Sequence, residues 1–272
     1  MRARIFGYLV LALVGVFAIG GALAADPAHV RLATTTSTVD TGLLDVLMPL
    51  FEKESGLKVD VVSVGTGAAL KLGENCDADV LLVHDRPAEN DFMKKGFGLF
   101  RRDVMHNEFV VVGPAGDPAN VAQAKTAVDA FARIAKAGAP FVSRGDDSGT
   151  HRRELKLWKA ARVDPEQKWR LSVGQGMGAT LRIADEKKAY TLCDNATFAK
   201  LGPQTQLKKW LAGDRDLANF YGVIAVNPER CPHVNRAAAL KFIDWLTGPA
   251  GQKALGDFKI DGQALFVPDA AP

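Results

Sequence analysis

Short apolar segments rich in β-branched residues alternate with amphipathic segments along most of the chain. Strands are predicted at 30–33, 57–62, 78–83, 108–112, 140–143, 189–192 and 222–226. Between them, apolar residues recur three or four positions apart, which predicts helices at 41–54, 68–72, 87–95, 127–137, 150–162, 177–187 and 234–246. This alternation predicts βαβ units, and therefore an α/β fold with a doubly wound sheet.

Two of these segments carry further expectations about packing. Strand 78–83 (ADVLLV) is almost continuously apolar, as expected when helices cover both faces of a parallel sheet. Helix 41–54 ends before Gly56, and a glycine just past the last turn commonly terminates a helix. Its predicted apolar face consists of Leu43, Leu44, Val46, Leu47 and Leu50.

The strand and helix pattern restarts after Gly113 and Pro114, which predicts two lobes. About 245 residues follow the N-terminal segment, too many for one compact core but suited to two lobes of roughly 100 to 150 residues. One lobe is expected to be discontinuous, with 25–110 plus 221–272, and the other to comprise 111–220. Because no low-complexity linker separates them, the strands EFVVV and GVIAV are expected to cross between the lobes.

The N-terminal segment has the pattern of a signal peptide. Arg2 and Arg4 precede an apolar run, and small residues follow that end in an A-x-A cleavage site at 22–24. The apolar run is also just long enough for an uncleaved membrane anchor, but the cleavage site favours removal of 1–24. The first cysteine is Cys76, so no lipidation cysteine follows the apolar run. These features predict a freely diffusing periplasmic protein.

Composition and charge exclude several classes of protein. The 272 residues are 47% apolar and 24% charged, which is ordinary globular composition. Without Arg2 and Arg4 the chain has 32 basic and 31 acidic residues, so nucleic-acid binding by bulk charge is not expected. Cys76, Cys193 and Cys231 are too widely spaced for a zinc ribbon or a redox pair. One disulfide and three buried thiols remain equally consistent with the sequence.

Five consecutive hydroxyl side chains, TTTST at 34–38, are predicted in a loop between strand 30–33 and the following helix. Such a loop places hydroxyls beside the unpaired N–H groups of a helix N-terminus, which favours an anion. Helix capping is the alternative, but Asp40 alone would be enough for that. A second turn one βαβ unit later, VGTGA, has a glycine on either side of Thr66. The candidate ligand-binding residues here are Thr34, Thr35, Thr36, Ser37, Thr66 and Gly67.

The segment SRGDDSGTHRRE at 143–154 joins a predicted strand to a predicted helix. Ser148 and Thr150 offer hydroxyls, and Gly149 exposes its backbone N–H. Arg144 supplies a planar fork that suits two oxygens of one oxyanion. Either of the two aspartates that follow it would cap the helix or hold the guanidinium. We therefore add Arg144, Ser148, Gly149 and Thr150 to the candidate ligand-binding residues.

A catalytic interpretation of the same segment is weaker. Ser148, His151 and Glu154 could form a triad in a secreted serine hydrolase, but triad members normally converge from separate elements, and G-x-S-x-G is absent. The other histidines are scattered, so no metal site is predicted. The glycine-rich run 174–180 lacks the last glycine of a dinucleotide fingerprint, so no cofactor is predicted and the run is interpreted as lining a cleft.

Seven segments together resemble, in order and over nearly the whole mature chain, the tungstate-binding periplasmic proteins of ABC transporters: TTTST, VGTGAALKLG, ADVLLVH, NEFVVVGP, SRGDDSGTH, GQGMGATLRIADEKKAYTL and YGVIAVNPE. The resemblance implies a type II periplasmic-binding-protein fold, with two α/β lobes joined by two crossing strands and the ligand between them. It also implies a partner permease and ATPase, no catalysis, and an oxyanion held by Thr35 with its neighbours, Thr66, Arg144 and Thr150. Cys76 and Cys231 depart from the pattern expected of the family.

The residues also bear on the identity of the anion. Tungstate and molybdate are fully deprotonated near neutral pH and need only donors, whereas hydrogen phosphate also needs an acceptor. The hydroxyl-rich segments favour tungstate or molybdate, but hydroxyls can also accept and Asp146 and Asp147 lie nearby, which weakens the argument against phosphate. A phosphate or sulfate binder of the same fold would share these segments, so both stay open as alternatives. Tungstate and molybdate are nearly isosteric, so the sequence does not separate them. We expect the protein to act as a monomer.

Overall fold

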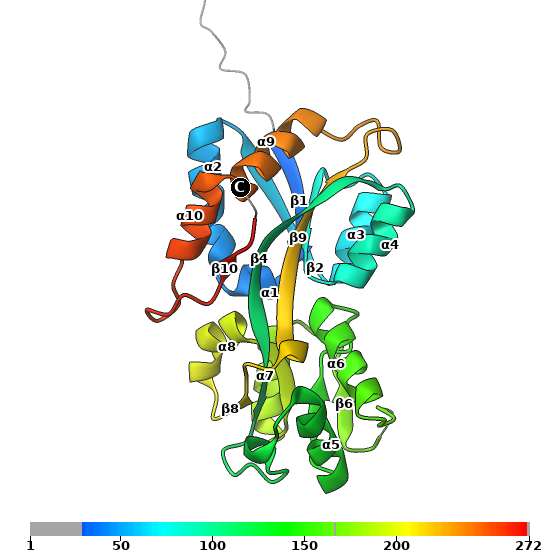
Figure 1. The fold of residues 1–272 in the computed structure, drawn as a ribbon, viewed down its shortest axis with the longest axis vertical. Helices are drawn as coiled ribbons and strands as arrows, with labels where there is room; N and C mark the ends of the chain where they lie inside the picture. Colours follow the sequence, from blue (N-terminus) through cyan, green and yellow to red (C-terminus); the bar gives the residue numbers. More distant parts are fainter. Residues whose placement is uncertain (1–28, 166, 271–272) are drawn as a thin grey trace, which may run out of the picture.

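The computed structural model describes residues 29–165 and 167–270. Two α/β lobes lie end to end and are joined by two long strands that run side by side from one lobe into the other (Figure 1). The predicted signal peptide, 1–24, lies outside the described residues. In the part of the chain that is described, no helix is both long and apolar enough to cross a bilayer.

The first lobe contains one mixed sheet with the strand order β10-β4-β9-β3-β1-β2. Strand β1 pairs in parallel with both β2 and β3, while β9 runs antiparallel to β3 and to β4. The strands are β1 (His29–Thr35), β2 (Lys58–Val64), β3 (Val80–Val83), β4 (Gly98–Gly113), β9 (Ala218–Val226) and β10 (Val267–Pro268).

Helices cover both faces of this sheet (Figure 1). One core lies against α2, α9 and α10, and a second lies against α3 and α4. In β3, Leu82 belongs to the first core and Leu81 and Val83 to the second, which explains the continuous apolar run predicted at 78–83. The helices are α1 (Thr36–Asp40), α2 (Leu43–Ser55), α3 (Thr66–Glu74), α4 (Arg86–Lys94), α9 (Arg236–Thr247) and α10 (Pro249–Asp257).

The second lobe is built around the C-terminal half of β4, which pairs antiparallel with β7 and β8, while β5 and β6 form a parallel pair. Its centre is aromatic: the Trp158 ring is fully buried, and its centroid lies 4.3 Å from that of Phe131. The elements are η1 (Val121–Gln123), α5 (Ala127–Ala137), β5 (Phe141–Ser143), α6 (Gly149–Ala160), β6 (Arg170–Ser172), α7 (Met177–Glu186), β7 (Thr191–Asp194), α8 (Asn195–Leu201), η2 (Gly202–Gln204), β8 (Lys208–Leu211) and η3 (Arg215–Leu217).

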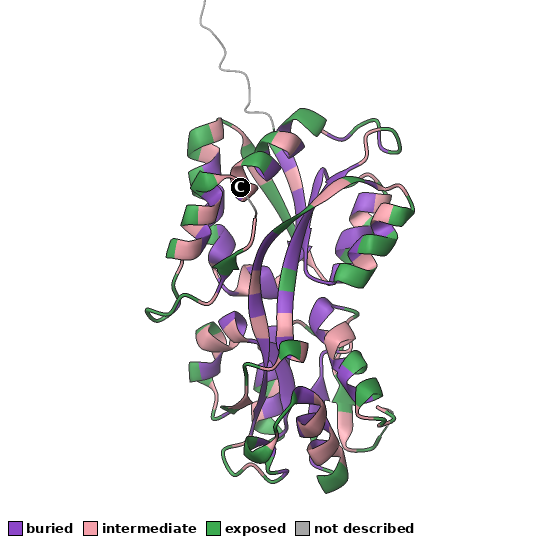
Figure 2. Ribbon diagram, viewed as in Figure 1, coloured by how far each residue is buried: buried purple, intermediate pink, exposed green. Residues whose placement is uncertain are grey.

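The crossing strands are β4 and β9, as the sequence predicted. They pair with each other from Gly98 to Glu108 of β4. Buried residues run along both strands through the junction of the lobes (Figure 2). The arrangement is that of a type II periplasmic-binding-protein fold. The lobe boundaries stay a prediction, and Ala196, within the predicted second lobe, packs into a core of the first.

The predicted helix 41–54 is found as α2, which begins at Leu43 and ends at Ser55. Gly42, whose φ of +80° favours glycine, separates it from α1, which begins within the predicted loop 34–38. The predicted apolar face is confirmed at Leu43, Leu44 and Leu47 and is wrong at Val46 and Leu50. Val46 and Leu50 are 43% and 39% exposed, whereas Met48 and Phe51 are buried. The side of α2 that meets the core is set by how the helix packs on the sheet, and this places Val46 and Leu50 on its flank.

A disulfide joins Cys76 to Cys231, leaving Cys193 as a buried free thiol. Cys76 follows α3 and Cys231 follows β9, so the bond connects segments 155 residues apart in the sequence within the first lobe. The structure thus selects one of the two alternatives that the sequence left open. Burial raises the pKa of the Cys193 thiol well above its usual value, so this group stays protonated at neutral pH.

Replacing both Cys76 and Cys231 by serine should lower the free energy of unfolding by about 2–5 kcal/mol, because closing so long a loop restricts the unfolded chain. The measurement is denaturant unfolding of the wild type and the double variant. Wild type with a reductant serves as a control that should approach the variant. Unfolding curves that coincide in all three samples would show that the bond does not stabilise the fold.

Candidate functional site

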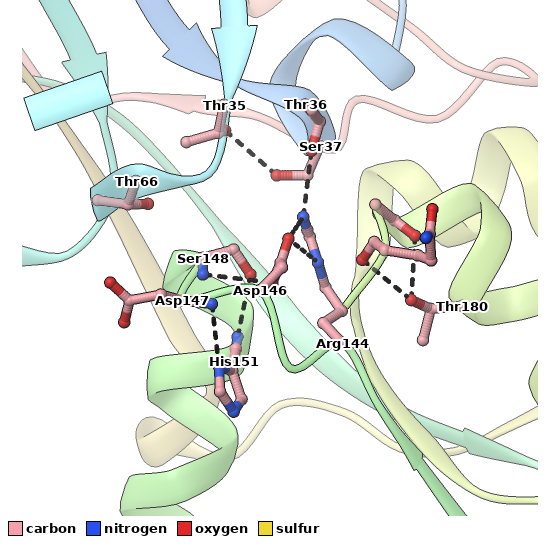
Figure 3. A network of polar contacts seen from close by, with 12 residues as sticks. Thr35, Thr36, Ser37, Thr66, Arg144, Asp146, Asp147, Ser148, His151 and Thr180 are labelled. Carbon is pink, nitrogen blue, oxygen red and sulfur yellow. Dashed lines mark hydrogen bonds and ion pairs between the residues drawn. The ribbon is translucent and has the colours of Figure 1, made fainter. Parts of the chain in front are cut away.

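The hydroxyl-rich segments of the two lobes meet between the lobes (Figure 3). The predicted loop 34–38 is not a loop: β1 continues to Thr35, which pairs with Val64 of β2, and Thr36 begins α1. The pairing with β2 extends the strand beyond its apolar residues. Asp40, which the sequence offered as a cap, is the last residue of α1 instead.

The hydroxyls of this segment point in different directions. The Thr34 hydroxyl donates to the Leu82 carbonyl at 2.8 Å, within the sheet. The Thr35 Oγ1 atom lies 2.7 Å from that of Thr38 and 3.2 Å from Ser37 Oγ. Thr36 instead faces the second lobe. The sequence suggested that these neighbouring hydroxyls would bind a ligand together. Because β1 extends through Thr35, their side chains point to different places instead.

Helices α3 and α6 begin opposite one another. Thr66 is the first residue of α3, and its Oγ1 accepts the backbone N–H of Gly149, the first residue of α6, at 3.0 Å. Ser148 caps α6, its Oγ accepting the N–H of His151 at 3.2 Å. A Cβ on Gly65 would lie 3.0 Å from the Asp146 carbonyl oxygen, a tight contact, so this approach of the lobes favours a glycine.

Arg144 lies at the centre of the junction and is only 2% exposed. Its Nε and Nη2 donate to the Asp146 carboxylate, and Nη2 also donates to Thr36 Oγ1 across the junction at 3.1 Å. The remaining Nη1 and the Thr150 hydroxyl are buried and have no hydrogen-bond partner among the described residues. Buried donors without a partner are costly to the protein, and each of these two points to an acceptor that the described residues do not supply.

Ion pairs connect the lobes beside Arg144. The Arg152 guanidinium of α6 donates two hydrogen bonds to the Asp147 carboxylate and a third, at 3.2 Å, to the Asp85 carboxylate of the first lobe. Lys156 lies 3.3 Å from the same Asp85 carboxylate. The hydrogen bond from Arg152 holds the pKa of Asp147 below its usual value. Carboxylates thus offset the nearby cations, and the two lobes are held in contact.

Ser148, His151 and Glu154, for which the sequence supported only a weaker catalytic interpretation, do not form a triad. Ser148 Oγ accepts a backbone N–H, and His151 Nδ1 accepts the N–H of Asp147 at 3.1 Å. Glu154 accepts hydrogen bonds from Trp158 and Arg170. None of the hydrogen bonds among the described residues joins these three side chains to each other, so the contact between nucleophile and base is missing.

The third glycine-rich segment faces the first lobe, as the sequence suggested. Gly176 precedes α7, and a Cβ placed on it would lie 3.7 Å from Thr36 Oγ1. Within 29–165 and 167–270 we find no group of three or more His, Cys, Asp or Glu side chains arranged to hold a metal ion.

Sequence reasoning missed His84, which is buried between the lobes. Its ring stacks on Tyr221 with centroids 4.8 Å apart, and a Cβ on Gly149 would lie 2.7 Å from the ring. Burial lowers the pKa of His84 to about 4, so the ring is neutral at pH 7. Its position directly after the buried strand ADVLLV was the only sequence signal.

Comparison with known proteins agrees with this geometry. The sequence model of the PBP superfamily domain matches residues 23–250. A putative ABC transporter anion-binding protein of Haloferax volcanii is 49% identical over 247 residues, covering 89% of this chain and 72% of that protein. The tungstate-binding protein TupA of Peptoclostridium acidaminophilum is 44% identical over 244 residues, covering 88% and 85%.

A solved structure supports the same relationship. The tungstate ABC transporter structure from Geobacter sulfurreducens superposes with a TM-score of 0.78 at 52% identity, covering 85% of this chain and 98% of that one. The chain therefore belongs to the periplasmic-binding-protein superfamily and, within it, to the family of the TupA tungstate-binding proteins.

Gly149→Ala should oppose closure of the two lobes, because the added methyl group meets the buried His84 ring. Strain of this kind costs about 1–3 kcal/mol. We expect a larger radius of gyration than in the wild type by small-angle X-ray scattering. Gly67→Ala is the matched control, since its methyl group meets mainly the exposed Asp147 carboxylate, which can rotate away. Equal radii for the two variants would contradict the prediction.

Proposed function

We propose that this protein is a periplasmic solute-binding protein that captures a tetrahedral oxyanion, tungstate, between its lobes. It delivers the ion to an ABC permease driven by an ATPase, and it acts as a monomer without catalysis. The support comes from relatives named as tungstate-binding or anion-binding proteins. Export through the predicted signal peptide 1–24 would place it in the periplasm.

The observation that carries this proposal is the pair of buried, unpartnered donors, Arg144 Nη1 and Thr150 Oγ1. Both belong to the second lobe, and the first lobe contributes hydroxyls directly opposite. The proposed ligand shell is Thr35, Thr36, Ser37, Thr66 and Gly67 from the first lobe, with Arg144, Ser148 and Thr150 from the second. Gly149 is left out, because its backbone N–H already donates to Thr66 Oγ1. Thr34 has no direct role in this shell, because its hydroxyl donates to the sheet.

Side-chain charge alone would not hold a dianion here. Asp146 already offsets much of the Arg144 charge, so the remaining stabilisation must come from backbone N–H groups at the starts of α3 and α6. A shell of N–H and O–H donors suits an ion whose oxygens are all acceptors. Tungstate and molybdate meet this condition near neutral pH, and hydrogen phosphate does not.

Ligand titration tests the function. Tungstate should raise the melting temperature, since a ligand that binds only the folded state adds about 4 kcal/mol at a thousandfold excess over Kd. Molybdate, sulfate and phosphate are compared at equal concentration, with calorimetry providing Kd. We expect tungstate and molybdate to bind and hydrogen phosphate to bind far more weakly, because only phosphate carries a proton that needs an acceptor. Equal stabilisation by phosphate would refute the proposed donor-only site.

Arg144→Ala should weaken tungstate binding at least tenfold, because a buried charge-assisted contact contributes about 1.5–3 kcal/mol. It should also lower the melting temperature, since Asp146 loses its partner. Arg144→Lys should restore binding only in part, because an ammonium group lacks the planar fork. Arg133→Ala removes a more exposed charge from the same lobe, paired with Asp129, and should leave Kd unchanged. Wild-type affinity in Arg144→Ala would exclude this site.

A further inference from the structure

The carboxylate of Asp85 belongs to the first lobe, but its hydrogen-bond donors belong to the second. Asp85 directly precedes α4, and its side chain is only 5% exposed. An aspartate in this position normally accepts N–H groups of its own helix, but here it forms no such bond. Among the described residues, the donors to its carboxylate are Arg152 and Lys156 of α6. If the lobes separated, this carboxylate would have only water as a partner.

The two cations reach Asp85 together because of helix geometry. They are four positions apart, so both side chains project from the same face of α6. Arg152 Nη1 lies 3.2 Å from one carboxylate oxygen, and Lys156 Nζ lies 3.3 Å from the other. Arg152 is also fixed within its own lobe, because its Nε and Nη2 donate to the Asp147 carboxylate. Asp85 therefore restrains the first turns of α6 at two points.

The start of α6 carries part of the proposed ligand shell. Ser148 caps this helix, and Thr150 lies in its first turn, two residues before Arg152. The Thr150 hydroxyl is buried without a partner, so the position of α6 decides whether that hydroxyl reaches an ion bound at the junction. A shift of α6 by about 1 Å would stretch a normal hydrogen bond from this hydroxyl beyond the usual range.

We propose that Asp85 is a positioning residue for the oxyanion site: through Arg152 and Lys156 it holds the start of α6 against the first lobe. This inference rests on the proposed function, because Ser148 and Thr150 belong to the proposed ligand shell. Asp85 does not itself touch the ion. If its charge acted directly on the ion, removing that charge would strengthen the binding of a dianion. If it positions α6, the same change weakens binding, so the sign of the effect separates the two roles.

Asp85→Asn tests this sign by calorimetry with tungstate. Asparagine is equally favoured at the start of a helix, so α4 should be preserved. We expect Kd to rise about five- to twentyfold, since this carboxylate is buried but its two cations are partly exposed. Asp91→Asn is the matched control, because it removes from α4 a charge that pairs with Lys95 of the same lobe, and Kd should not rise. Binding by Asp85→Asn as tight as the wild type or tighter would overturn the proposal.

Small-angle X-ray scattering adds a test that needs no ligand. Without tungstate, Asp85→Asn should have a larger radius of gyration than the wild type, whereas Asp91→Asn should not. Saturating tungstate should return Asp85→Asn to the wild-type radius, which would also show that this variant is folded. An unchanged radius in ligand-free Asp85→Asn would overturn the role of Asp85. Failure of the wild type to bind tungstate would instead contradict the proposed function.

Discussion

A guanidinium group almost completely removed from water is the constraint around which the centre of this protein is arranged. Desolvating a charge costs several kcal/mol unless it is paired and hydrogen-bonded. Asp146 provides the pair for Arg144, and Thr36 of the other lobe provides an acceptor. Contact between the lobes therefore buries the charge and at the same time supplies the acceptor from Thr36. The Nη1 atom of Arg144 has no hydrogen-bond partner among the described residues, and the same holds for the buried hydroxyl of Thr150.

The same constraint explains why the lobes are joined by strands. Strands β4 and β9 pair along the junction and carry Asn107 and Asn219 into its interior, where the two amides bond to each other and to neighbouring groups from both lobes. A flexible linker could not hold these groups within hydrogen-bond distance. The crossing strands thus provide the connection and also part of the polar interior behind the cleft.

Charge is nearly balanced around the cleft, which affects how an anion could be selected. Arg144, Arg152 and Lys156 each have a carboxylate partner, and the Asp85 carboxylate joins α6 to the other lobe. Attraction by net charge would not distinguish one dianion from another. Directed N–H and O–H donors do distinguish a fully deprotonated dianion from hydrogen phosphate, because they favour oxygens that carry no proton.

The sequence by itself determined the class of fold, the two crossing strands and the segments that meet at the cleft, because these depend on local periodicity and on motifs where strands end and helices begin. Only the tertiary structure decided which hydroxyls face the cleft, since pairing with β2 extends β1 through Thr35 and directs Thr34 into the sheet. It also decided the exposure of Val46 and the pairing of Cys76 with Cys231. His84 gave almost no local signal, because its buried position is defined by contacts with residues more than forty positions away in the sequence. Contacts between distant segments are set by packing, and a local pattern does not record them.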